Sequence, residues 1–147
     1  MSDRLTPQVI VGVARSTAGL AALRAAAAEA ARRGVPLHAA RVRSSIFGPV
    51  DDYSQIDEAL EKALGGFPVG LEVRRELLAP PISQALADRA GNPGDLLFIG
   101  ARGRGVSRLL HRFRSRSVVR GCLRRAQCPV VVVSADSAPP INTFISL

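Results

Sequence analysis

The sequence predicts an α/β fold in which five parallel strands form one open sheet with helices on both faces. Short runs of apolar, often β-branched residues alternate with stretches of helical periodicity, which is typical of strand–helix–strand units. Three of the runs, VIVGV, LLFIG and PVVVV, are continuously apolar, as strands buried on both faces of a sheet are. With 147 residues, 47% of them hydrophobic, the chain is long enough for one domain with a full core.

The first half of the chain predicts two strand–helix pairs. QVIVGV predicts a buried strand over residues 8–13, and the Ala-rich segment after it predicts a helix over 19–33 that ends at a glycine. PLHAARV predicts a second strand over 36–42. After a polar loop, Ser54 is expected to cap a helix that ends at Gly65-Gly66.

The second half predicts three strands and two helices. LEVRREL, over 71–77, alternates apolar and charged residues and predicts a half-buried strand at an edge of the sheet. A helix is expected over 82–90, and DLLFIG predicts a strand over 95–100. PVVVV predicts the last strand over 129–133. A helical stripe of core residues precedes it, formed by Val119, Cys122, Leu123 and Ala126.

The strand order follows from how apolar each strand is. The third strand fits an edge and the first and fourth fit the centre, so we expect the order 3-2-1-4-5 with right-handed crossovers. In this order, the chain adds strands toward one edge of the sheet up to strand three and then, from strand four, toward the other edge, so the switch point lies between strands one and four. Ligands of open α/β sheets bind beyond the carboxyl ends of the strands at such a switch point. The turns after Val13 and after Gly100 are therefore expected to face each other across a pocket.

Positive charge is concentrated in one segment of the chain. The net charge is +8, yet no acid stands between Asp95 and Asp136. Nine arginines do: Arg102, Arg104, Arg108, Arg112, Arg114, Arg116, Arg120, Arg124 and Arg125. Taking these nine from +8 leaves −1 for the rest of the chain. The segment is expected to meet an anionic partner, unless it is only the solvated face of a helix.

Cysteine and histidine spacing excludes several classes of site. Cys122 and Cys128 lack a second pair and a nearby histidine, so neither a zinc site nor a disulfide framework is predicted, and both are expected to be buried structural thiols. His38 and His111 do not fit a ligand set or a catalytic relay. No catalytic residue and no metal ligand is predicted.

The amino terminus does not show the pattern of a targeting signal. MSDRLTPQVI is not a signal peptide, and charges interrupt the longest Ala/Leu-rich stretch, so no membrane span is predicted and a cytoplasmic location is expected. We expect a short lead over residues 1–7, one domain over 8–134 and an appended tail over 135–147.

Three motifs in this order resemble the universal stress protein family. They are VIVGV followed by a Ser/Thr turn, LLFIGARGRG, and CPVVVV after the last helix, and the resemblance spans about residues 8–134. It implies a Rossmann-like fold and, in the nucleotide-binding branch, a site for ATP. That branch carries an acid just after the first strand for adenine. It also carries a G-x-x-G loop, followed nine residues later by Gly-Ser/Thr, for ribose and phosphates.

This sequence departs from that pattern at two places. Ala14 stands where the acid is expected, and the slot of the second glycine, aligned back from Cys128, holds Arg116 before Ser117. Gly100 and Gly103 match the first half of the loop. The resemblance therefore implies an adenine nucleotide bound weakly, or no cofactor at all. The implied binding residues are Val13, Ala14, Arg15, Val42, Gly100, Arg102, Gly103, Arg116, Ser117 and Val118.

Two functions remain open from the sequence. The first is a cytoplasmic stress-response module that binds a nucleotide or another anion and is not an enzyme. The alternative is a nucleotide-independent stress protein whose Arg-rich segment docks an acidic protein or nucleic acid. Specific nucleic-acid binding is not expected, because the chain has one Tyr, five Phe and no Trp for base stacking. The resemblance also implies a homodimer, which would form through the apolar last strand, residues 129–134.

Overall fold

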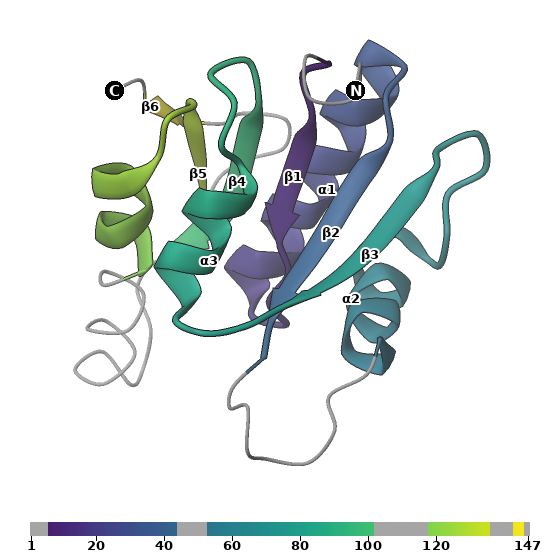
Figure 1. Cartoon of the computed structure of the whole chain (residues 1–147). Coiled ribbons are helices and arrows are strands. Elements are labelled where there is room, and N and C mark those ends of the chain that lie inside the picture. Colours follow the sequence, from purple (N-terminus) through teal and green to yellow (C-terminus); the bar gives the residue numbers. More distant parts are fainter. Residues whose placement is uncertain (1–5, 44–52, 102–117, 136–142, 146–147) are drawn as a thin grey trace.

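Apolar strands form the centre of the molecule in the computed structural model, which describes residues 6–43, 53–101, 118–135 and 143–145. The five parallel strands are β1 (Val9–Gly12), β2 (Leu37–Val42), β3 (Val73–Leu78), β4 (Leu96–Ala101) and β5 (Val130–Ser134). They lie in the order β3-β2-β1-β4-β5, so the predicted fold class and strand order are confirmed (Figure 1). A further strand, β6 (Thr143–Ile145), pairs antiparallel with β5 and was not predicted.

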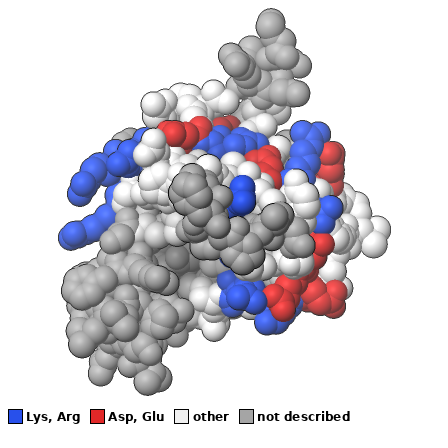
Figure 2. Space-filling model, turned by 60° about the horizontal axis from the view of Figure 1, so that its bottom comes forward, with Lys and Arg blue, Asp and Glu red and all other residues white. Residues whose placement is uncertain are grey.

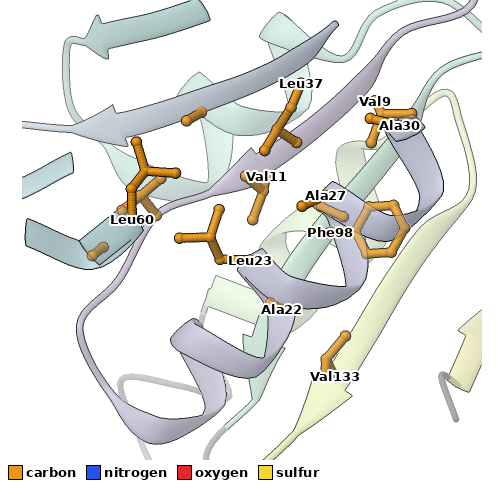
Figure 3. Packing of buried hydrophobic residues seen from close by; sticks show 14 of the residues in the cluster. Val9, Val11, Ala22, Leu23, Ala27, Ala30, Leu37, Leu60, Phe98 and Val133 are labelled. Carbon is orange, nitrogen blue, oxygen red and sulfur yellow. The ribbon is translucent and has the colours of Figure 1, made fainter. Parts of the chain in front are cut away.

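Helices cover both faces of the sheet. They are α1 (Thr17–Arg33), α2 (Ser54–Leu64), α3 (Ile82–Arg89) and a helical segment at residues 118–125. One core cluster joins α1 and α2 to one face of the sheet, and it includes Leu23, Leu60 and Phe98 (Figure 3). A second cluster joins α3 and the helical segment 118–125 to the opposite face, and it includes Ile10, Leu86 and Cys122. The parallel strands are therefore buried on both sides, which explains their continuous apolar runs.

The ends of two helices differ from the sequence-based prediction. Ser16 caps α1, because its Oγ accepts a hydrogen bond from the Gly19 amide at 3.1 Å, so the helix begins earlier than expected. The predicted Ser54 cap is wrong. Tyr53 occupies the cap position of α2 without a side-chain hydrogen bond, and Ser54 is the first helical residue. The glycine stops at Gly34 and Gly65 are confirmed, and both residues have the left-handed conformation.

Candidate functional site

A pocket of about 420 Å³ lies at the carboxyl edge of the sheet. It sits where β1 and β4 neighbour each other, which is the switch point of the strand order. Its lining residues are Gly12, Val13, Ala14, Arg15, Ser16, Ala40, Arg41, Val42, Ile82, Leu86, Ile99, Gly100 and Val118. The volume is within the roughly 300–1,000 Å³ of small-molecule sites. Strands far apart in sequence thus contribute to one cavity.

Two glycines allow the walls of this pocket to approach each other closely. A Cβ on Gly100 would stand 2.6 Å from the carbonyl carbon of Ala18, so only glycine lets the end of β4 contact the start of α1. A Cβ on Gly19 would stand 2.5 Å from the carbonyl oxygen of Ala14. The turn after β1 is therefore folded tightly against the first turn of α1, and this fixes the position of the residues between them.

One wall of the pocket is apolar. Val42 ends β2, Ile99 lies in β4, and Ile82 and Leu86 come from α3, which packs over the same face of the sheet. Val118 begins the helical segment 118–125 and completes the wall. Ile82 remains 45% exposed, so part of this wall is open to solvent. Such a surface can bury the face of an aromatic ring.

The charged groups in the described lining are both arginines. Arg15 Nη1 lies 3.0 Å from Glu58 Oε1 of α2, and both side chains are about half exposed. Arg41, in β2, also lines the pocket, and its Nε is buried. No carboxylate lines the described part of the pocket. The site therefore favours an anionic ligand over a cationic one.

Exposed ion pairs also lie on the described surface outside the pocket lining. Figure 2 brings the carboxyl edge of the sheet forward, and on its right-hand side acidic and basic side chains lie next to one another. Arg75 Nη1, for example, donates to both carboxylate oxygens of Asp57 at 2.9 Å. The Cζ atom of Arg75 lies 4.6 Å from the centre of the Tyr53 ring. These exposed pairs partly neutralise the described surface and add little stability each.

The pocket brings together six of the ten residues that the sequence implies. They are Val13, Ala14, Arg15, Val42, Gly100 and Val118. The other four, Arg102, Gly103, Arg116 and Ser117, lie outside the described residues. The prediction missed Gly12, Ser16, Ala40, Arg41, Ile82, Leu86 and Ile99. The carboxyl-end rule could have found Gly12, which ends β1, and Ala40 and Ile99, which lie in the last three residues of β2 and β4. Nothing in the sequence shows that α3 folds over this edge.

The thiols behave as the sequence predicts. Cys122 and Cys128 are free and buried, and burial raises the pKa of each thiol to about 11. Both therefore stay protonated at neutral pH, as structural thiols do.

Within the described residues, no three His, Cys, Asp or Glu side chains gather as metal ligands would. No helix in this part of the chain has the length and apolar character that a membrane crossing requires.

Comparison with known proteins agrees with the topology and the motifs. The model of the universal stress protein family matches residues 6–134. The chain belongs to this family. The match begins before β1 and ends at the last residue of β5, so it contains the whole parallel sheet and every described pocket residue. The resemblance inferred from the motifs is confirmed.

Solved structures of universal stress proteins share the fold. A universal stress protein in complex with cAMP aligns with a TM-score of 0.64 and 24% identity, over 88% of this chain and 98% of the other. A universal stress protein from Archaeoglobus fulgidus aligns with a TM-score of 0.65 and 24% identity, over 87% of this chain and 98% of the other. A third structure, the universal stress protein from Archaeoglobus fulgidus in complex with dAMP, aligns with a TM-score of 0.60 and 22% identity, over 87% of this chain and 98% of the other. None of the curated proteins matches the chain.

Proposed function

We propose that this universal stress protein is a regulatory module that binds an adenine nucleotide weakly in the pocket at the carboxyl edge of its sheet. The observation that carries the proposal is the cavity of about 420 Å³ at the switch point, which combines an apolar wall with two arginines. Two proteins of the same fold support it, since one is in complex with cAMP and another with dAMP. A cytoplasmic location stays a prediction of the sequence.

Weak binding is expected from the residues that line the described part of the pocket. The apolar wall of Val42, Leu86 and Ile99 can hold a base, and arginines attract phosphates. At Ala14, however, a methyl group stands where the resemblance implies an acid. Loss of one charge-assisted hydrogen bond costs about 1.5–3 kcal/mol, which is about ten- to a hundredfold in affinity. ATP, AMP and cAMP are thus expected to bind in the high-micromolar range or more weakly.

Restoring the carboxylate tests the proposal. Ala14→Asp should tighten AMP and ATP binding by about ten- to a hundredfold, because the new carboxylate accepts a hydrogen bond from the nucleoside. Ala14→Asn is the matched control, since it has the same shape and no charge, and it should recover only part of the gain. Isothermal titration calorimetry on all three chains measures the effect. Nanomolar ATP affinity in the unmodified protein, or an unchanged affinity in Ala14→Asp, would contradict the proposal.

Binding rather than catalysis fits the groups that line the pocket. General acid–base catalysis needs a carboxylate, histidine or similar group within hydrogen-bond reach of the substrate. The described lining provides arginines, Ser16 and apolar residues instead. The proposed module therefore transmits the presence of its ligand and does not turn it over at an enzymatic rate.

A second candidate function rests on the Arg-rich segment. Its nine arginines and lack of acids give it a strong local charge, and three of them, Arg120, Arg124 and Arg125, lie in the helical segment 118–125 beside the pocket. Such a segment suits an acidic protein or the phosphates of a nucleic acid. In this alternative the segment docks the partner outside the pocket and no nucleotide is required.

A further inference from the structure

The two edges of the sheet are protected in different ways. β3 forms one edge, and its Arg74 and Arg75 side chains are exposed, so charge discourages another strand from pairing there. β5 has the sequence VVVVS and carries no charge. Its outer side is covered instead by β6, which comes from the tail of the same chain (Figure 1). The homodimer expected through residues 129–134 would need the side of β5 that β6 occupies in this conformation.

β6 runs in the direction, relative to β5, that the β5 strand of a second copy would need in a two-fold dimer. A two-fold axis perpendicular to a sheet reverses strand direction, so a dimer that continues the sheet across this edge pairs β5 antiparallel with the other copy's β5. β6 also runs antiparallel to β5. Its backbone thus occupies the same row of N–H and C=O groups that the second copy would use.

The cover is short compared with the strand that it protects. β6 has three residues, and it pairs Val130 with Ile145, Val131 with Phe144 and Val132 with Thr143. Val133 and Ser134, the last two residues of β5, lie beyond this register. A second copy's β5 has five residues and could pair along the whole edge. Because the longer strand makes more backbone hydrogen bonds, it can compete with the tail.

We propose that β6 is an intramolecular cover that competes with a second copy of this chain for the β5 edge. The chain is a monomer while β6 is docked, and it forms a two-fold dimer with one continuous sheet when β6 leaves. The homodimer expected from the sequence is then conditional on the tail. This inference concerns the edge of the sheet and does not depend on a ligand in the pocket.

A proline in β6 of the full chain tests the competition. Phe144→Pro places a residue without an N–H group in the middle of β6, so pairing with β5 should fail. We expect light scattering to give the mass of one chain for the unmodified protein at low micromolar concentration and of two chains for Phe144→Pro, with a dimer dissociation constant lowered at least tenfold. Ser137→Pro, in the tail but outside β6, is the matched control and should remain a monomer.

A disulfide provides the opposite test. Val132 and Thr143 lie directly opposite each other, so Val132→Cys together with Thr143→Cys can lock the tail on β5. The oxidised protein should stay monomeric at high concentration, and reduction should restore concentration-dependent dimers. An unmodified protein that is already a dimer, a disulfide that forms between chains, or a folded Phe144→Pro variant that stays monomeric would each overturn the proposal. Circular dichroism establishes the folding of each variant.

Discussion

At the scale of single residues, a partly buried ion cluster on the α3 face joins three elements of the fold. His38 Nδ1 of β2 lies 2.9 Å from Glu76 Oε2 of β3, and Arg89 of α3 donates to both oxygens of Glu76, at 2.6 and 2.8 Å. Arg89 also donates to Gln8 Oε1 at 2.8 Å. Burial alone would raise the pKa of Glu76, but the hydrogen bonds and charges of His38 and Arg89 outweigh it and lower the pKa to about 2. The cluster therefore holds a carboxylate in its charged form.

This cluster predicts a pH-dependent stability. The pKa of Glu76 is lower in the folded chain than its ordinary value of 4.5, so its contribution is complete above pH 4.5 and is lost as the pH falls toward about 2. Glu76→Gln should lower the free energy of unfolding by about 1–3 kcal/mol at pH 7, and the difference should narrow between pH 4.5 and 2. Urea titrations at several pH values measure it. Glu72→Gln, which removes an exposed partner of Arg74, should have little effect. A Glu76→Gln difference that stays constant over this range would contradict the explanation.

At the scale of elements, a glycine sets the contact between two helices. Gly121 lies in the helical segment 118–125, and a Cβ there would stand 2.5 Å from Cβ of Ser83 in α3 and would also overlap Ser83 Oγ. In an isolated helix, alanine is more stable than glycine by about 1 kcal/mol. Here the close approach of α3 reverses this preference.

The contact predicts the sign of a substitution. Gly121→Ala should lower the free energy of unfolding by about 1–3 kcal/mol, because the added methyl group pushes the two helices apart. Ser83→Gly removes both overlapping atoms and should restore part of the loss when combined with Gly121→Ala. Thermal and urea unfolding of the two single variants and the double variant measure the coupling. Stabilisation by Gly121→Ala alone would show that the helices do not pack this closely.

At the scale of the whole molecule, charge is divided between the Arg-rich segment and a nearly neutral remainder. Replacing Arg112, Arg114 and Arg116 by Gln separates the two functions proposed above. If the segment is part of the nucleotide site, AMP and ATP affinity should fall about tenfold or more. If it is an external docking surface, DNA and heparin affinity should fall, with a weaker dependence on salt. Binding measured at low and moderate salt decides between them. Unchanged binding of AMP, ATP, DNA and heparin would assign the segment to the solvated surface of the molecule.

The sequence predicts the parallel sheet well because each strand carries its own signal. Val9, Val11 and Phe98 belong to continuous apolar runs, as expected for strands covered on both faces, whereas the charged residues Arg74 and Arg75 among apolar ones mark β3 as an edge. Six pocket residues could be named in advance from the family resemblance, and five of them lie near or just after the carboxyl end of β1, β2 or β4, where parallel strands meet at one edge. Capping was less predictable, since Ser16 and Ser54 are both plausible caps and only the local backbone distinguishes them.

By itself, the sequence determined the family, the order of the parallel strands and the loss of an acid at Ala14, since these depend on residue types in a fixed order. The tertiary structure alone decided that Ile82 and Leu86 complete the pocket and that residues 143–145 cover β5. Both outcomes depend on how segments distant in sequence pack against one another. The three residues of β6 are too few to carry a periodic signal of their own, and their strand conformation depends on the backbone groups that β5 presents.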